Sequence, residues 1–218
     1  MTGDRFRILF VCGANICRSP FAEAVTRHLL TRWLPPGEAF RFSVVSAGVK
    51  AVVGADVDAR TRAELIRCGL HRESGARHVA QQVDRSSVAM ADLVLTAERE
   101  HRGVVVAMHP PALRTTFSLL EFSRLLASAE LDPLERDAVR RARTAVAAAA
   151  AERGMAPPVS PEDDSVPDPM GGPEELRAHS YALIGSATSS VLDAILGEWR
   201  RTSSTNRTDA KSVTGGGD

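Results

Sequence analysis

Short apolar runs alternate with amphipathic stretches along most of the chain. Four short apolar or extended runs are predicted to be strands, at residues 6–11, 40–45, 92–96 and 114–117. Apolar positions at helical spacing predict helices between and after them, at residues 20–33, 55–68, 98–106, 119–126, 132–153 and 174–199. This alternation of strands and helices indicates an α/β fold.

The first predicted strand, helix and strand form a βαβ unit over residues 6–45. Such a unit pairs its two strands in parallel through a right-handed crossover. We therefore predict a three-layer α/β domain whose central parallel sheet has four strands and is flanked by helices. We assign residues 1–200 to this single domain.

Two segments differ in composition from the rest. Residues 127–160 are low in hydrophobicity, which predicts a helical insertion packed lightly on the domain, followed by a proline-rich acidic linker. Residues 201–218 lack apolar content and contain three consecutive glycines, which predicts a disordered tail.

Composition excludes several classes of partner. The 218 residues include 27 basic and 27 acidic side chains, so no strongly basic surface for nucleic acid is expected. No apolar run approaches the roughly 20 residues of a membrane-spanning helix, and no signal-peptide pattern precedes the first strand. Three cysteines, two of them in one loop, do not make a disulfide scaffold. We therefore expect a cytoplasmic protein that binds neither nucleic acid nor membrane. The sequence indicates no particular oligomeric state.

A polar loop of residues 12–19 connects the first predicted strand to the helix that follows. Cys12 opens this loop and Arg18 lies six residues later. Ser19 is predicted to cap the helix and Pro20 to occupy its first position. Backbone N–H groups converge at a helix N-terminus, and the helix dipole favours an anion there. The loop therefore predicts an anion site between a thiol and a guanidinium group.

The two end residues of this loop supply complementary chemistry. A thiolate at Cys12 is a strong nucleophile, and the helix N-terminus together with Arg18 favours the ionised form. A tetrahedral oxyanion such as phosphate would bind the loop amides, with Arg18 contacting two of its oxygens. The alternative is a structural cysteine in a tight turn, with Arg18 only a surface charge.

The spacing of Cys12, five residues, Arg18 and Ser19 resembles the signature loop of cysteine-dependent phosphatases. With Asn15 and Cys17 in place, the loop is similar to that of the low-molecular-weight protein tyrosine phosphatase family in particular. This resemblance implies the phosphotyrosine protein phosphatase I-like fold. It also implies hydrolysis of protein phosphotyrosine, or of a similar small phosphomonoester, through a phosphocysteine intermediate.

The resemblance extends over residues 6–123 and 165–199. It implies that no metal ion or cofactor takes part in the reaction. The residues that would surround the phosphate are Gly13, Ala14, Asn15, Ile16, Cys17 and Ser19.

Breaking a phosphoester also needs a group that protonates the departing oxygen and later activates water. Asp168 lies between two prolines, which fix the backbone that presents its carboxyl group. The resemblance implies that this Asp-Pro pair, just before the last helix, supplies the general acid. The alternative is that the pair only forms a turn. Asp163 and Asp164 are weaker candidates because they lie in the predicted flexible linker.

The resemblance further implies a network that braces the loop. In the family, a loop asparagine, here Asn15, hydrogen-bonds to a serine after the second strand and to a downstream histidine. Ser46 and His78 stand at the matching positions. Ser19 would donate a hydrogen bond to the nucleophilic sulfur. His78 could instead be a solvated loop histidine, and His71 is a competing candidate.

The other two cysteines have different expected roles. The resemblance implies that Cys17 can trap an oxidised Cys12 as a reversible disulfide, whereas packing under the loop is the alternative. Cys68 closes a predicted helix and is expected to be an ordinary packed residue.

Three positions depart from the family pattern and leave the substrate open. Ala14 stands where glycine is usual, and Gly13 stands where a larger residue is common. Met170 replaces an aromatic residue that would stack on a phosphotyrosine ring, and methionine holds a ring less firmly.

Three alternative functions therefore stay open. Phosphoarginine phosphatases of the family resemble the loop but tend to have threonine in place of Gly13. Arsenate reductases rely on further cysteines, of which only Cys68 is left. A non-catalytic oxyanion-binding module is disfavoured, since binding alone needs neither a nucleophile nor an acid.

Overall fold

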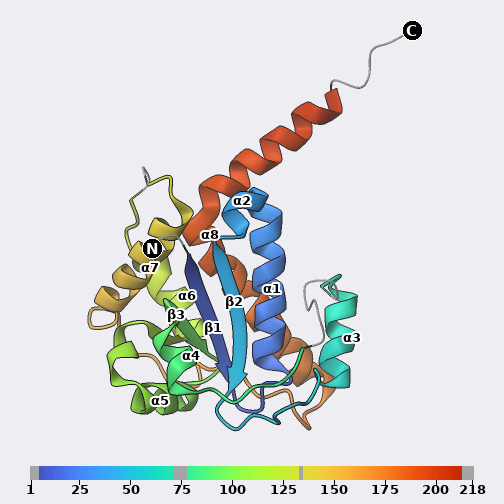
Figure 1. Ribbon diagram of the computed structural model, residues 1–218, viewed down its shortest axis with the longest axis vertical. Helices are drawn as coiled ribbons and strands as arrows, with labels where there is room; N and C mark the ends of the chain where they lie inside the picture. The colour runs from blue at the N-terminus through green and yellow to red at the C-terminus, as the bar shows by residue number, and fades with distance from the viewer. Residues whose placement is uncertain (1–4, 71–77, 133–134, 213–218) are drawn as a thin grey trace.

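Four parallel strands form one sheet in the order β2–β1–β3–β4 (Figure 1). The computed structural model describes the backbone of residues 5–70, 78–132 and 135–212, and side chains as far as residue 196. The strands are β1 (Phe6–Cys12), β2 (Phe42–Gly48), β3 (Leu93–Thr96) and β4 (Thr116–Ser118). The predicted four-stranded parallel sheet is confirmed.

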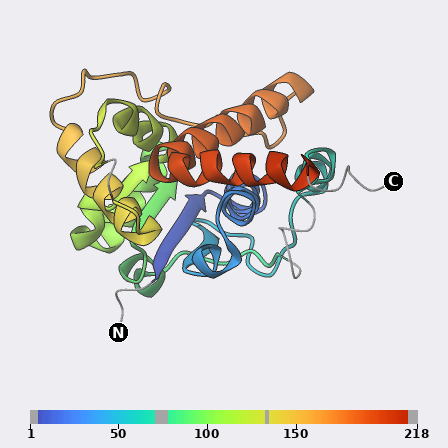
Figure 2. The same cartoon turned by 90° about the horizontal axis from the view of Figure 1, so that it is seen from above.

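Helices cover both faces of this sheet, which confirms the predicted three layers (Figure 2). One face packs against α1 (Arg18–Trp33), α6 (Leu119–Ser128), α7 (Ala138–Glu152) and α8 (Glu174–Ser212). The other face packs against α4 (Arg85–Ala89), α5 (Arg99–Met108) and the 3₁₀ turn η1 (Pro110–Arg114). Two short helices, α2 (Pro36–Ala39) and α3 (Ala59–Arg67), lie on the β2 side of the molecule (Figure 1).

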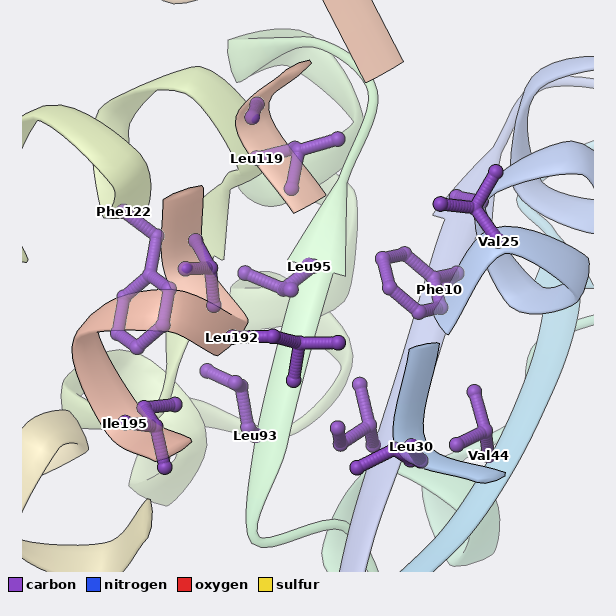
Figure 3. Packing of buried hydrophobic residues seen from close by; sticks show 14 of the residues in the cluster. Phe10, Val25, Leu30, Val44, Leu93, Leu95, Leu119, Phe122, Leu192 and Ile195 are labelled. Carbon is purple, nitrogen blue, oxygen red and sulfur yellow. The ribbon is translucent and has the colours of Figure 1, made fainter. Parts of the chain in front are cut away.

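The central strand β1 is buried on both faces, as its almost continuous apolar sequence requires. Ile8 and Phe10 belong to the core under α1 and α8, whereas Leu9 and Val11 belong to the core under α4 and α5. Phe10 pairs in register with Leu95 of β3, and both side chains lie on the face that meets α8 (Figure 3). The parallel register brings the C-terminal ends of β1 and β3 to the same edge of the sheet.

The predicted start of the first helix is wrong. α1 begins at Arg18 rather than at Pro20, and its N-cap residue is Cys17, which makes no side-chain capping bond. Ser19 lies inside the helix, and its hydroxyl is hydrogen-bonded to the sulfur of Cys12 instead of capping the backbone. The helix therefore begins two residues before the position predicted from Pro20.

α3 is shorter than the predicted range. Asp58 is its N-cap residue and accepts hydrogen bonds from the backbone N–H groups of Arg60 and Thr61, at 3.0 and 3.2 Å. Cys68 follows the last turn of α3 and is exposed, so the expectation of a packed cysteine is wrong.

α7 belongs to the core, so the prediction of a lightly packed surface helix is wrong. Its inward side chains are all at most 6% exposed: Ala138, Val139, Ala142, Ala145, Val146 and Ala149. Because alanine side chains are short, α7 approaches its neighbours closely, and low hydrophobicity does not prevent burial. Arg141 fixes the contact with α8 by donating a hydrogen bond of 2.6 Å to the carbonyl of Ile195. Residues 133–134, before this helix, lie outside the described residues.

α8 extends to Ser212, past its predicted end near residue 199. Residues 201–212, which were predicted to be disordered, continue the helix, and this end projects away from the rest of the molecule (Figure 1). No proline interrupts the segment, and each added helical residue adds one backbone hydrogen bond. Residues 213–218 lie outside the described residues. No described helix combines the length and apolar character of a membrane-spanning segment.

Aspartate substitutions in α7 test how firmly this helix packs. Ala142→Asp places an unpaired carboxylate at a position that is 0% exposed, so we expect the free energy of unfolding to fall by about 3 kcal/mol or more. Ala147→Asp makes the same change at an exposed position of α7 and should cost less than about 1 kcal/mol. Urea denaturation followed by circular dichroism measures both variants, and equal losses would contradict the packing.

Candidate active site

Residues 12–17, which we call the anion loop, connect β1 to α1 and turn several carbonyl groups toward one neighbouring segment. Residues 49–58 donate backbone hydrogen bonds of 2.9 to 3.1 Å to four of these carbonyls, those of Cys12, Gly13, Ala14 and Ile16. Within the described part of the chain, no group accepts a hydrogen bond from the backbone N–H groups of residues 13–17. These N–H groups remain available to form a cradle for an anion.

Gly48, at the end of β2, sets how closely the anion loop approaches the sheet. A Cβ atom at this position would lie 2.5 Å from the carbonyl oxygen of Gly13 and 3.0 Å from the backbone nitrogen of Asn15. Both neighbours are backbone atoms, which could move away only if the loop changed its shape. Glycine is therefore required at position 48 by this close approach.

Asn15 stands at the centre of the network that braces the loop. It is 0% exposed, and its side-chain amide donates hydrogen bonds to the hydroxyl groups of Ser19 and Ser46, at 2.9 and 3.0 Å. Its side-chain oxygen accepts a hydrogen bond of 2.9 Å from the backbone of Gln81. The Nε2 atom of His78 lies 2.8 Å from the Asn15 carbonyl oxygen. The structure thus brings together the residues proposed for this network.

The backbone of Asn15 also has an unusual conformation. Its φ of 58° is the one positive value among the described non-glycine residues, and asparagine tolerates this region better than most residues. Ala14, which replaces the usual glycine, is therefore not strained. His71, the competing candidate for the network, lies outside the described residues.

Cys12 is 2% exposed, and its sulfur lies 3.0 Å from the hydroxyl oxygen of Ser19. That hydroxyl oxygen already accepts a hydrogen bond from Asn15, so its own proton is left for the sulfur or for the carbonyl of Ala47 at 3.3 Å. The Ser19 hydroxyl group can therefore donate a hydrogen bond to the Cys12 sulfur.

Arg18 links the anion loop to two distant segments. Its side chain is 5% exposed, forms an ion pair with Glu98 just after β3, and donates a hydrogen bond of 2.9 Å to the carbonyl of Val166. Its second terminal nitrogen lies 3.2 Å from a carboxylate oxygen of Asp168. The predicted nucleophile loop and the predicted acid therefore meet at one guanidinium group.

Residues 165–170, which we call the acid loop, are fixed to the sheet and to α8. The backbone of Val166 donates a hydrogen bond of 2.8 Å to the carbonyl of Ala97, and the hydroxyl of Ser180 donates one of 2.9 Å to the carbonyl of Pro167. Asp168 itself is 52% exposed. The acid loop thus holds this carboxyl group beside Arg18 while leaving it accessible.

The segment before the acid loop was predicted to be a flexible linker, but its last residue, Asp164, is firmly held. Asp164 is 1% exposed, and its carboxylate forms ion pairs with Arg99 and Arg124, at 2.6 and 3.1 Å. This buried, doubly paired carboxylate holds the chain in place. Asp163 is exposed and accepts a hydrogen bond from the backbone of Ser160 in a local turn. Asp168 therefore remains the carboxyl group available to the site.

A second contact between the anion loop and the acid loop, besides the Arg18–Asp168 ion pair, is made by Cys17 and Met170. The Cys17 thiol donates to the sulfur of Met170 at 3.3 Å. Burial raises the pKa of Cys17 to about 11, so it is a thiol at neutral pH and a poor nucleophile. Met170 is 50% exposed. A disulfide between Cys12 and Cys17 stays a prediction.

Two further residues at the site, Glu98 and His101, were not predicted from the sequence. Glu98 is the carboxylate partner of Arg18. The Nε2 atom of His101 lies 3.7 Å from the point where a Cβ atom on Gly13 would stand. One sequence signal could have found both residues: they follow a parallel strand at the sheet edge where Cys12 lies.

The site combines a thiol, a cradle of N–H groups, a buried guanidinium and an accessible carboxyl group. Transfer of a phosphoryl group to sulfur requires these groups. No cluster of three or more His, Cys, Asp or Glu side chains in the described ranges is arranged to hold a metal ion.

Comparison with protein families gives a match over residues 7–152 to the model described as low molecular weight phosphotyrosine protein phosphatase. The probable low molecular weight protein-tyrosine-phosphatase EpsP of Ralstonia nicotianae is 34% identical over 117 residues, which cover 54% of this chain and 72% of the relative. A protein-arginine-phosphatase of Geobacillus stearothermophilus is also 34% identical over 117 residues, covering 54% and 71%. A Streptomyces coelicolor low molecular weight protein-tyrosine-phosphatase is 29% identical over 202 residues, covering 87% and 93%.

Solved structures support the same fold. The YwlE arginine phosphatase of Geobacillus stearothermophilus superposes with a TM-score of 0.61 at 23% identity, covering 88% of this chain and 94% of that one. The tyrosine phosphatase Wzb of Escherichia coli, solved with sulphate, gives a TM-score of 0.57 at 21% identity, covering 84% and 93%.

Two substitutions at Asn15 separate its hydrogen bonds from its backbone conformation. Asn15→Ala removes the side-chain hydrogen bonds and leaves a strained backbone, so the free energy of unfolding should fall by about 3 kcal/mol. Asn15→Gly removes the same bonds without the strain and should cost about 1 kcal/mol less. Urea denaturation measures both; a glycine variant no more stable than the alanine variant would contradict this assignment.

Proposed function

Because the chain belongs to the low molecular weight phosphotyrosine protein phosphatase family, we propose that it hydrolyses phosphotyrosine in phosphorylated proteins. Cys12 is the nucleophile, Arg18 and the loop amides bind the phosphoryl group, and Asp168 is the general acid. The observation that carries this proposal is the 3.2 Å ion pair between Arg18 and Asp168, because it joins the acid to the cation at the nucleophile loop.

In the first step, the Cys12 thiolate attacks phosphorus in line with the bond to the leaving oxygen. An S–P bond forms as the P–O bond breaks, and the leaving oxygen takes the proton of the Asp168 carboxyl group. The equatorial oxygens, which carry the developing negative charge, bind the N–H groups of the anion loop and Arg18. The products of this step are the free phenol and a phosphocysteine.

In the second step, a water molecule attacks the phosphocysteine. The Asp168 carboxylate takes a proton from this water as the new O–P bond forms and the S–P bond breaks. The sulfur leaves as a thiolate, which the Ser19 hydroxyl at 3.0 Å stabilises by donating a hydrogen bond. Inorganic phosphate then departs, and the starting state is restored.

The Arg18–Asp168 ion pair changes when substrate binds. In the free protein the guanidinium group of Arg18 pairs with the carboxyl group of Asp168. A bound phosphoryl dianion competes for the same guanidinium group. The carboxyl group of Asp168 then becomes available to the leaving oxygen that it protonates in the first step.

Phosphoarginine is the second candidate substrate, because the relative named as an arginine phosphatase is as similar as the EpsP relative, at 34% identity over 117 residues each. Arsenate reduction has weaker support, since the thiol of exposed Cys68 is hydrogen-bonded to Glu64 of the helix that precedes it.

Parallel turnover assays on a phosphotyrosyl peptide, phosphoarginine and arsenate with a thiol reductant distinguish these functions. The fastest turnover is expected on the phosphotyrosyl peptide. Oxyanion binding without turnover of any substrate would instead indicate a non-catalytic module.

We also propose a cytoplasmic location. Cys12, Cys17 and Cys68 are all free thiols, and a reducing compartment keeps a nucleophilic thiol active. The proposed partners are phosphorylated proteins.

Substitutions at Cys12 and Asp168 test the proposed roles. Cys12→Ser should abolish turnover of an aryl phosphate while phosphate still binds, because the cradle and Arg18 remain. Asp168→Asn should lower kcat by about 10²- to 10⁴-fold with vanadate affinity retained. Steady-state kinetics and vanadate inhibition measure both effects.

Asp163→Asn is the matched control for the acid, since Asp163 is an exposed carboxylate five residues away that only closes a local turn. It should hydrolyse the aryl phosphate at the wild-type rate. Unchanged hydrolysis by Cys12→Ser, or equal effects of the two aspartate substitutions, would refute the assigned roles.

A further inference from the structure

His101 is a buried side chain beside the anion loop to which the proposed reaction gives no role. It lies in the first turn of α5 and is 8% exposed. No described residue is hydrogen-bonded to either of its ring nitrogens, and Nδ1 is buried without a partner. Because native structures rarely leave buried polar atoms unpaired, an unpaired imidazole at this place calls for an explanation.

Gly13 of the anion loop lies beside this imidazole. A Cβ atom on Gly13 would have the Nε2 atom of His101 as its neighbour, at the ordinary contact distance of 3.7 Å. Gly13 does not have the positive φ that requires glycine, unlike Gly54, Gly69 and Gly171. Neither backbone conformation nor crowding therefore explains glycine at position 13. Its effect is to leave Nε2 uncovered beside the anion loop.

Charged groups of both signs surround His101. Glu98 and Glu100 come from the start of α5, Arg18 from the start of α1, and Asp168 from the acid loop. Burial and the nearby Arg18 together outweigh the carboxylates and lower the pKa of His101 below its usual value. The imidazole is therefore neutral at neutral pH and carries one ring proton.

The position of that proton follows from burial. An N–H group at Nδ1 would be buried without an acceptor, which is rarer in proteins than an unpaired acceptor atom. The favoured tautomer therefore carries the proton on Nε2, the nitrogen that faces Gly13. His101 thus offers a hydrogen-bond donor next to the place where the phosphoryl group is proposed to bind.

We propose that His101 is a substrate-contacting residue whose Nε2–H group donates a hydrogen bond to a substrate oxygen beside the transferred phosphoryl group. This inference rests on the proposed phosphatase function and deepens it. The bridging atom of a phosphate ester is an oxygen that accepts hydrogen bonds, whereas the bridging atom of phosphoarginine is an N–H group that donates them. A donor at this position favours oxygen-linked phosphates over nitrogen-linked ones.

Two substitutions at His101 test the donor. His101→Phe keeps a ring of similar size and removes both nitrogens, so kcat/KM for a phosphotyrosyl peptide should fall about three- to tenfold. Most of this change should appear in KM, because Cys12 and Asp168 are untouched. His101→Gln places an amide N–H near the position of Nε2 and should restore most of the loss. Vanadate inhibition should be unchanged in both variants if the cradle is intact.

His109→Phe is the matched control, since His109 follows α5 and also has a buried, unpaired Nδ1. It should leave kcat/KM unchanged, and thermal unfolding of all three variants measures their stability. Equal kcat/KM for His101→Phe and the wild type would overturn the inference, as would a glutamine variant no better than the phenylalanine variant. A wild type without turnover of any phosphorylated substrate would instead overturn the proposed function.

A substitution at Gly13 tests the same contact without changing the imidazole. Gly13→Ala should fold normally, because its methyl group meets Nε2 at an ordinary distance, yet the methyl group covers that nitrogen. We expect Gly13→Ala to lower kcat/KM on the phosphotyrosyl peptide by a larger factor when it is introduced into the wild type than when it is introduced into the His101→Phe variant. If the double variant loses kcat/KM by the product of the two single-variant factors, the inference is overturned.

The ratio of phosphotyrosine to phosphoarginine turnover tests the substrate class. His101→Phe should lower this ratio, because only the oxygen-linked substrate loses a hydrogen bond. An unchanged ratio would overturn the stated preference.

Discussion

The close contact between the anion loop and the end of β2 is the constraint on which the site depends. The loop carbonyls are satisfied by backbone N–H groups of the segment that follows Gly48. A side chain at position 48 would meet the loop backbone at 2.5 Å. Because the carbonyls are held on that side, the loop N–H groups are left for an anion. Asn15 supplies the left-handed turn that this path needs, and its side chain ties the loop to β2 through Ser46.

Arg18 couples this cradle to the acid loop. A guanidinium group that is 5% exposed is stable only with partners of opposite charge and good geometry. It finds them in Glu98, the Val166 carbonyl and Asp168, which come from two other parts of the chain. The acid loop in turn depends on Asp164 and its two arginine partners. The position of Asp168, the proposed general acid, is therefore fixed by its own ion pair with Arg18 and by those of Asp164.

The parts that follow local rules could be predicted from the sequence. The strands have short apolar or extended runs, so the sheet could be predicted. The spacing of residues in the anion loop resembles that of a known family, so the loop residues could be predicted as well. Burial of α7 could not be predicted from its low hydrophobicity. Hydrophobicity does not show how closely a helix with small alanine side chains can approach its neighbours. Glu98 and His101 were missed because the residues beside which they lie, Arg18 and Gly13, are far away in the sequence. The early start of α1 was missed because the Ser19 hydroxyl contacts the Cys12 sulfur and the Ala47 carbonyl instead of capping the helix.

The structure separates the groups proposed to perform the reaction from those proposed to face the rest of the substrate. Cys12, Asn15 and Arg18 are nearly fully buried and are held by several hydrogen bonds or ion pairs. A change at Asn15 or Arg18 removes contacts that shape the loop as well as groups of the site. By contrast, Met170 is half-exposed, and nothing in the packing requires glycine at position 13. Residues at this rim can therefore differ between relatives without disturbing the cradle. Under the proposed mechanism, a difference at this rim changes the substrate and leaves the reaction the same.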